Sequence, residues 1–175
     1  YGWVFDNESD TLSFDLSSVY GFDGTEILDN KLIVEPLAFY FLHRISMVLD
    51  GRRMLLFLDE FWKWIGGDSF KSFIYDGLKT FRKRNGSLIM ITQSPSEILN
   101  SDVASAIVEQ VETSIFLPNS NAKHDEYSVL NISDKEFNHI TNLADDSRVF
   151  LIKKGNDNEG DGRGNTVLIK LDLSA

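Results

Sequence analysis

The sequence predicts an α/β fold whose core is a set of parallel strands. Two short runs of consecutive apolar residues, 54–58 and 88–91, are typical of strands that a parallel sheet buries on both faces. Residues 70–81 lie between them and carry apolar side chains at helical spacing, and further strand and helix patterns alternate afterwards. With 175 residues, the chain has the size of one ordinary domain, so we expect residues 1–175 to form a single domain.

The composition excludes several classes of protein. The hydrophobic share of 42% and the charged share of 25% are those of a soluble globular protein, which excludes disordered, collagen-like and coiled-coil chains. There is no cysteine, so disulfides and thiol catalysis are excluded. The 17 basic and 27 acidic residues give a net charge of −10, and nucleic acid is therefore not an expected partner, because phosphate contacts need Lys and Arg. No apolar run reaches the roughly 18 residues of a membrane span.

The first third of the chain predicts a hairpin followed by a helix. Residues 3–5 and 12–16 have strand-like compositions on either side of a turn-like segment at 7–10. We expect the helix to begin at Pro36, because the first helical turn tolerates proline. Its apolar residues recur at helical spacing, and Asp50 and Gly51 follow its end: Leu37, Phe41, Ile45 and Val48.

The rest of the chain predicts alternating helices and strands. The helix over 70–81 stops before Asn85 and Gly86, and residues 94–97 (Ser-Pro-Ser-Glu) carry two signals for the start of a helix. A helix over 101–110 and a strand over 113–117 follow, and then a capping box at 133–136 opens a helix that ends near residue 142. Two last strands, 149–152 and 167–171, are joined by the glycine-rich segment 155–164 and predict an antiparallel hairpin.

The acidic pair Asp59 and Glu60 follows the first apolar strand directly, which is a Walker B pattern. Ligands of doubly wound sheets bind at the carboxyl ends of the strands. Two adjacent acids there divide the work: one holds Mg²⁺ through water, and the other orients or deprotonates an attacking water. The simpler alternative is a strand that ends in two solvated acids.

Polar and basic residues near the second strand extend this candidate site. Thr92 and Gln93 follow that strand, and a glutamine there can hydrogen-bond a γ-phosphate or the attacking water, although a polar residue after a strand is more often part of a turn. Residues 82–84 (Arg-Lys-Arg) end the helix between the two strands. An arginine there can stabilise a phosphoryl group bound by a neighbouring subunit, whereas the helix dipole alone also favours cations at that end.

One half of a nucleotide site is missing from the sequence. A nucleoside triphosphatase of this design uses G-x-x-x-x-G-K-[ST], whose backbone amides and lysine hold the phosphates. The 175 residues contain no Gly-Lys dipeptide. We therefore expect this chain alone to bind ATP and Mg²⁺ poorly and not to hydrolyse ATP.

Five blocks of sequence resemble a known family. The opening WVFDNESD and GFDGTEILDN, and then GRRMLLFLDEFWKW, LKTFRKRNGSLIMITQSPSE and EQVETSIFLPN, are similar to the C-terminal ATPase domain of the large cytoplasmic ATPase of type IV secretion and conjugation systems, the VirB/TrbE/CagE family. The similarity runs from Trp3 to about Leu151, and its most specific blocks are residues 59–62 and 92–95. More distantly, the chain is similar to the HerA–FtsK group of hexameric motors.

The resemblance implies a RecA-like, three-layer P-loop NTPase fold with a mostly parallel sheet and a C-terminal antiparallel hairpin. It implies that residues 1–175 are the distal part of one such domain, with the P-loop strand and helix missing. It further implies ATP and Mg²⁺ as ligands and a homo-oligomer, expected to be a hexamer, that works with other type IV secretion components to energise pilus assembly and export. The implied location is the bacterial cytoplasm, peripheral to the inner membrane and without a transmembrane segment.

The family's functional residues carry over by motif. The resemblance implies that Asp59 is the acid on the metal side, holding Mg²⁺ through water, that Glu60 is the catalytic acid and that Gln93 is the sensor. Arg82 resembles an inter-subunit arginine finger, with Arg84 as the alternate. Arg148, which precedes a late strand, is a further candidate for a phosphate-sensing contact.

Two other functions stay open at this point. The chain is alternatively a non-catalytic, ATPase-like interaction module of the secretion machinery, and an upstream P-loop in the gene would favour the enzyme over this module. The second alternative is a DNA-translocating conjugative coupling motor. The net charge of −10 disfavours it, although such motors can confine basic residues to a central pore.

Overall fold

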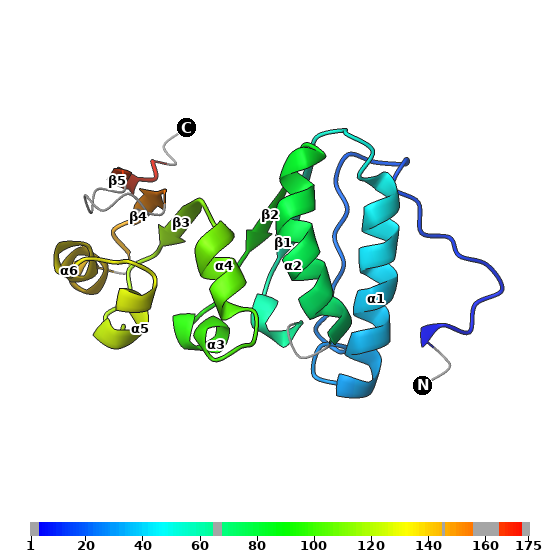
Figure 1. Ribbon diagram of the computed structural model, residues 1–175, viewed down its shortest axis with the longest axis horizontal. Coiled ribbons are helices and arrows are strands. Elements are labelled where there is room, and N and C mark those ends of the chain that lie inside the picture. The colour runs from blue at the N-terminus through cyan, green and yellow to red at the C-terminus, as the bar shows by residue number, and fades with distance from the viewer. Residues whose placement is uncertain (1–3, 65–67, 145, 156–164, 173–175) are drawn as a thin grey trace. The chain divides into compact units, whose positions relative to one another are not determined.

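The computed structural model describes residues 4–64, 68–144, 146–155 and 165–172 (Figure 1). The chain divides into two compact units. The N-terminal unit comprises Tyr1–Glu97 and Ser101–Val103, and the C-terminal unit comprises Ile98–Asn100 and Ala104–Ala175. Each unit has its own sheet, with parallel strands in the first and antiparallel strands in the second.

The predicted N-terminal hairpin is wrong. Among the described residues before Asn30, the chain forms turns and irregular segments and no strand. Its polar contacts go instead to a helix: Arg44 binds both the carboxylate of Asp10 and the carbonyl of Leu12, and the Tyr40 hydroxyl donates to Asp10 at 2.7 Å. Strand-like composition cannot anticipate such contacts, because the partners lie some 30 residues further along the chain.

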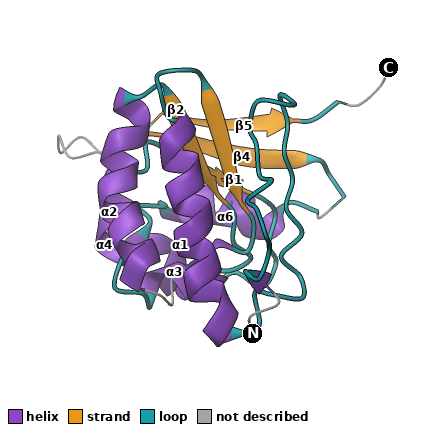
Figure 2. Cartoon of the chain, turned by 90° about the vertical axis from the view of Figure 1, so that its right-hand side faces the viewer, coloured by secondary structure: helices purple, strands orange, loops and turns teal. Residues whose placement is uncertain are grey.

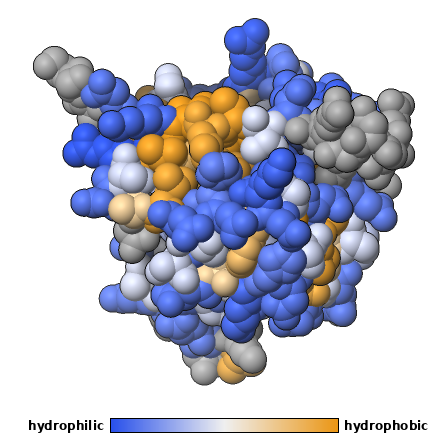
Figure 3. Space-filling view, turned by 90° about the vertical axis from the view of Figure 1, so that its left-hand side faces the viewer, coloured by the Kyte–Doolittle hydropathy of each residue, from blue (hydrophilic) through white to orange (hydrophobic). Residues whose placement is uncertain are grey.

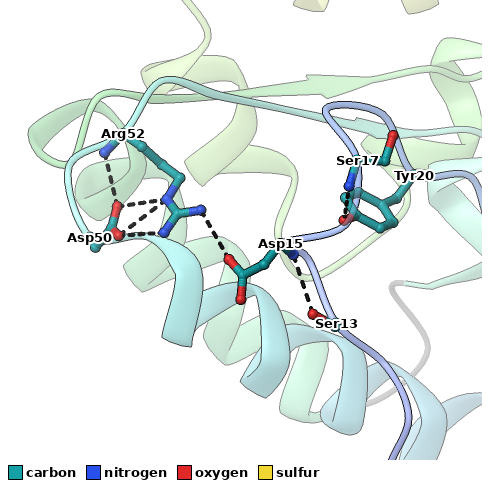
Figure 4. A network of polar contacts seen from close by, with 6 residues as sticks. All are labelled: Ser13, Asp15, Ser17, Tyr20, Asp50 and Arg52. Atoms are coloured by element: carbon teal, nitrogen blue, oxygen red, sulfur yellow. Dashed lines mark hydrogen bonds and ion pairs between the residues drawn. The ribbon is translucent and has the colours of Figure 1, made fainter.

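A second set of contacts involves residues 13–20 of the same segment (Figure 4). The Arg52 guanidinium lies 3.7 Å from the Asp15 carboxylate and 2.8 Å from that of Asp50. The hydroxyls of Ser13 and Tyr20 accept from the backbone N–H groups of Asp15 and Ser17. The N-terminal segment is thus tied to the loop that precedes the first strand.

Helix α1 (Lys31–Val48) begins five residues before the proline at which we expected it to start. The Asn30 side chain caps it by accepting from the backbone N–H of Leu32. Pro36 therefore lies inside the helix, where it removes one backbone hydrogen bond and crowds the carbonyl of Leu32. The asparagine cap was the start signal, and the proline was not.

The N-terminal unit contains the predicted strand, helix and parallel strand: β1 (Met54–Leu58), α2 (Asp68–Lys83) and β2 (Gly86–Met90). The short helix η2 (Phe61–Lys63) follows β1. Helix α2 buries the predicted apolar stripe through Phe70, Ile74 and Phe81, and it packs against β2 and against α1 (Figure 2).

Strand β1 is not buried on both faces, and this part of the prediction is wrong. Leu55 and Phe57 are 65% and 61% exposed, whereas Met54, Leu56 and Leu58 on the other face are half-buried. A continuous apolar run does not show whether both faces of its strand are covered. Within the described residues, the face of β1 that carries Leu55 and Phe57 is exposed.

The elements after β2 are short helices and a three-stranded sheet. They are α3 (Pro95–Leu99), α4 (Ala104–Gln110), β3 (Thr113–Phe116), α5 (His124–Val129), α6 (Asp134–Asn142), β4 (Val149–Lys154) and β5 (Asn165–Lys170). The strands run antiparallel in the order β3-β4-β5, which confirms the C-terminal hairpin. The expectation of a mostly parallel sheet is wrong for the described residues, because β3 pairs with β4 and only β1 and β2 are parallel. The segment 156–164 lies outside the described residues.

A partly buried ion pair lies beside the core of the C-terminal unit. Tyr127, Ile132, Ile140 and Leu151 form its apolar centre. Beside it, the Glu136 carboxylate lies 3.3 Å from the Lys153 ammonium, and their side chains are only 12% and 10% exposed. Glu136 also completes the predicted capping box with Ser133, and it accepts from the Thr166 hydroxyl of β5. One side chain therefore joins α6 to two strands.

Apolar side chains gather on one face of the molecule in the view of Figure 3. The antiparallel sheet carries an apolar outer face, opposite the side on which Leu151 is buried. We define this outer face by the alternating residues of the three strands and their ends: Ile115, Leu117, Phe150, Ile152, Val167, Ile169 and Leu171. Among the described residues, no helix is both long and apolar enough to cross a bilayer.

Candidate functional site

The acidic pair and the glutamine follow neighbouring parallel strands at the same edge of the sheet. Strands β1 and β2 pair in register, with Leu58 opposite Met90. Asp59 and Glu60 come directly after Leu58, and Gln93 comes three residues after Met90. We call residues 59–60 and 91–93 the rim. Sequence reasoning predicted that these residues share one edge, and this placement is confirmed.

Backbone hydrogen bonds fasten the two halves of the rim to each other. The N–H of Ile91 donates to the carbonyl of Leu58, and the N–H of Phe61 donates to the carbonyl of Ile91, both at 3.0 Å. The Phe61 side chain is fully buried and lies against the Phe70 ring, with 5.8 Å between the ring centroids. The first helical residue after the acids is therefore both packed in the core and bonded to the segment that leads to the glutamine.

Glu60 has an unusual backbone conformation. Its φ of 44° and ψ of 44° place it in the left-handed region, which costs a residue other than glycine about 1 kcal/mol or more. The turn is tight: the Glu60 N–H donates to the Asp59 carboxylate at 2.9 Å, and the Glu60 carbonyl accepts from the N–H of Lys63 at 2.9 Å. Strain of this kind is concentrated at functional sites, and here it lies on the proposed catalytic acid.

Lys63 binds the Glu60 carboxylate, a contact that sequence reasoning missed. Its ammonium lies 2.9 Å from Glu60 and 2.9 Å from Asp29, which precedes α1. Hydrogen bonds from the ammonium to Asp29 and then to Glu60 raise the pKa of Lys63 above its usual value. Glu60 and Lys63 are three residues apart, a spacing compatible with their contact. Nothing in the sequence pointed to Asp29, which lies 34 residues before Lys63.

The segment around Gln93 is held by Thr92. The Thr92 hydroxyl donates to the Glu97 carboxylate at 2.7 Å, which ties the rim to the first turn of α3. Helix α3 begins at Pro95 as predicted, but the expected capping box with Ser94 does not form, because the Ser94 hydroxyl pairs with that of Ser96 at 2.7 Å. Gln93 itself is exposed and follows its strand at the same edge of the sheet as the acids.

The structure does not bring Arg82 and Arg84 to the rim of their own chain. Both lie at the C-terminal end of α2, where the backbone enters β2. The Arg84 guanidinium donates to the Leu49 carbonyl at 3.2 Å, beside the start of β1. This end of α2 and the rim lie at opposite ends of strands β1 and β2. Helix α2 has 16 residues and is about 24 Å long.

Arg148 belongs to the C-terminal unit. It is exposed, and its φ of 54° puts it in the left-handed region immediately before β4. Its carbonyl accepts from the N–H of Leu171 at 2.8 Å, which closes the end of the β4–β5 pair. Its role in phosphate sensing stays a prediction.

The rim offers oxygen ligands but no complete metal cage. Among the described residues there is no group of three or more His, Cys, Asp or Glu side chains that could hold a metal ion. Mg²⁺ is commonly bound by one or two carboxylates together with waters and substrate phosphates, so a single exposed carboxylate such as that of Asp59 suits it. The arrangement can thus hold Mg²⁺ only in company with a phosphate ligand.

Parallel strands that deliver an acidic pair and a polar sensor to one edge are the architecture of a P-loop NTPase domain. Residues 31–155 match the TraG P-loop domain family, and the chain belongs to this family.

Its relatives are proteins of type IV secretion systems. "Type IV secretion system protein virB4" of Bartonella quintana (strain Toulouse) is 47% identical over 156 residues, which cover 88% of this chain and 20% of that protein. The protein of the same name from Brucella abortus biovar 1 (strain 9-941) is 43% identical over 89% of this chain and 19% of its own length. "Type IV secretion system protein PtlC" of Bordetella pertussis is 40% identical over 98% of this chain and 20% of its own. The resemblance noted from the sequence is confirmed, and the chain spans about a fifth of the length of these relatives.

Proposed function

We propose that this chain supplies the Walker B acids and the sensor glutamine of a type IV secretion ATPase, which hydrolyses ATP to energise pilus assembly and the export of protein or DNA. The observation that carries the proposal is the rim: Asp59, Glu60 and Gln93 follow two adjacent parallel strands, joined by hydrogen bonds through Ile91. Relatives named as type IV secretion system proteins support the biological role.

The residues of the rim suit ATP and Mg²⁺ in part. Bound Mg²⁺ neutralises the charge that develops on the transferring phosphoryl group. The Asp59 carboxylate is exposed, and one of its oxygens accepts from the Glu60 N–H, which leaves the other for a water of the metal shell. The phosphates need a glycine-rich loop with lysine, and no such motif occurs in these 175 residues. That half of the site has to come from other polypeptide.

Each rim residue has a distinct task under this proposal. Glu60 orients the attacking water and takes its proton, because its carboxylate is an acceptor next to the metal-side acid. Gln93 hydrogen-bonds the γ-phosphate or that water and transmits its state through Thr92 to α3. Asp59 holds Mg²⁺ through water.

The remaining features of the proposal concern assembly. Arg82, with Arg84 as the alternate, acts as a finger on the nucleotide of a neighbouring subunit, since neither lies at the rim of its own chain. The active form is then a homo-oligomer, proposed to be a hexamer, peripheral to the inner membrane on the cytoplasmic side and in contact with other secretion components. Arg148 is proposed to sense phosphate, and residues 1–175 to be the distal part of one RecA-like domain.

The test of the proposal is Glu60→Gln in the complete protein. Loss of the carboxylate should lower kcat for ATP by about a hundredfold or more and leave nucleotide affinity largely unchanged, because only the group that activates water is removed. Turnover is measured by phosphate release and affinity by calorimetry. Glu35→Gln, an exposed glutamate of α1, is the matched control and should behave as wild type. Normal turnover by the Glu60 variant would refute the assignment.

A further inference from the structure

The Glu60 side chain is 36% exposed, and Lys63 is its partner in an ion pair. A glutamate side chain has three rotatable bonds, and ordering such a side chain costs conformational entropy. The hydrogen bonds of the turn hold the Glu60 backbone in its left-handed conformation, but they do not fix the carboxylate at the end of the side chain. A group that activates water must nevertheless be held close to its productive position, because small displacements cost large factors in rate.

Lys63 has the contacts of a support for Glu60. Its ammonium binds Glu60 on one side and Asp29 on the other, each at 2.9 Å, so that it is itself held at two points. It also lies 5.5 Å from the centroid of the Trp62 ring, and its side chain is only 20% exposed. A lysine fixed in this way gives up little further freedom when it holds a carboxylate.

We propose that Lys63 is the positioning residue of the catalytic acid: anchored by Asp29, it aims the Glu60 carboxylate at the rim. The inference rests on the function proposed above and adds a residue that the Walker B pattern does not contain. Lys63 touches neither nucleotide nor water in this role and acts through Glu60 alone. Asp29, which lies before α1 and far from the acids in sequence, thereby becomes part of the site's support.

The experiment uses the complete protein and two substitutions at the same position. Lys63→Met keeps an unbranched side chain against Trp62 but removes the charge, and Lys63→Arg keeps the charge. We expect Lys63→Met to lower kcat about tenfold, with KM and the calorimetric affinity for nucleotide unchanged, and Lys63→Arg to recover most of the loss. Lys71→Met is the matched control, since Lys71 pairs with Asp102 at 2.7 Å. It should keep the wild-type kcat.

A second readout does not depend on turnover. Hydrogen–deuterium exchange of the peptide that spans residues 59–64 in the nucleotide-free protein should become faster in Lys63→Met and stay slow in Lys63→Arg. Asp29→Ala removes the anchor and leaves Lys63 in place, so it should give a smaller fall in kcat of about threefold. This variant keeps the inference testable if Lys63→Met does not fold.

The outcomes separate this inference from the proposed function. If Lys63 acts through Glu60, then adding Lys63→Met to Glu60→Gln should lower kcat no further. A wild-type kcat in Lys63→Met, with Glu60→Gln inactive, would overturn the inference and leave the proposed function standing. A fall in nucleotide affinity that matches the fall in kcat would also overturn it, since Lys63 would then bind nucleotide directly. Full activity in Glu60→Gln would refute both the proposed function and this inference.

Discussion

The backbone N–H of Phe61 donates to the carbonyl of Ile91 at 3.0 Å and so joins the turn after one parallel strand to the exit of the next. This bond has a functional meaning because the acids precede Phe61 and the glutamine follows Ile91. Phe61 is fully buried, whereas Ile91 is 44% exposed. The bond therefore anchors the segment that leads to the glutamine to the packed turn that follows the acids.

The first prediction concerns ATP binding by the 175-residue chain on its own. We expect weak or undetectable binding of ATP with Mg²⁺, and no hydrolysis, because no phosphate-binding loop is present in its sequence. Titration calorimetry checks this directly. Sub-micromolar affinity would mean that the rim residues hold the phosphates by a means other than the one proposed.

The second prediction concerns the packing of Gly86 at the start of β2. A Cβ built there lies 2.8 Å from the Phe81 ring and 3.1 Å from a Leu49 methyl group, and both of these side chains are buried. Gly86→Ala should therefore destabilise the N-terminal unit by about 1–3 kcal/mol.

Tryptophan fluorescence during urea unfolding measures this change, since Trp3, Trp62 and Trp64 all belong to that unit. Gly21→Ala is the control, because its Cβ would meet no atom within 4 Å, and it should change stability by about 0.5 kcal/mol or less. Equal stabilities of the two variants would contradict the packing argument.

The third prediction concerns pH and the Glu136–Lys153 pair. Burial raises the pKa of Glu136, but hydrogen bonds from Thr166 and Ser133 and the charge of Lys153 outweigh burial, so the pKa lies below its ordinary value of 4.5. A carboxyl whose pKa is lower in the folded state contributes stability above its unfolded pKa. That contribution is lost as the pH falls through the folded pKa.

Glu136→Gln should accordingly destabilise the C-terminal unit by about 2 kcal/mol at pH 7, and the difference from wild type should shrink as the pH falls below 4.5. Hydrogen exchange of the α6 amides at several pH values follows this unit specifically. Glu109→Gln, at an exposed position on α4, should show no such pH dependence. A difference that grew on acidification would reverse the assigned sign.

The fourth prediction concerns Arg82, which lies at the edge of the sheet opposite the rim. Arg82→Ala should lower ATP turnover in the complete protein, and mixing it with Glu60→Gln subunits should restore part of the activity, because those subunits supply an intact arginine to a neighbour's site. Lys83→Ala, at the same helix end, is the control and should keep its activity. If mixing restores nothing, the arginine does not act between subunits.

The features that the sequence predicted correctly are the local ones. The acids directly follow an apolar run, the stripe from Phe70 to Phe81 has helical spacing, and Ser133 and Glu136 have the spacing of a capping box. Each of these patterns involves residues one to four positions apart or repeats at a fixed period. The interactions that form these elements can therefore be predicted from neighbouring residues in the sequence.

The features that it missed depend on pairing over long distances. Among its described residues, the N-terminal segment binds Arg44 and Tyr40 of α1 instead of forming a hairpin. Strand β3 joins an antiparallel sheet because its partner is β4, more than 30 residues later. The support of Glu60 by Asp29 through Lys63 is of the same kind. The local composition of a segment does not indicate which distant residues it will contact.

The apolar outer face of the β3-β4-β5 sheet has a consequence for handling the protein. Exposed, flat strand edges and apolar patches favour self-association, and at neutral pH the net charge of −10 opposes it by repulsion between molecules. That repulsion vanishes near the isoelectric point of about 4.7. Buffers near that pH should therefore favour aggregation of this chain, and purification belongs well above it.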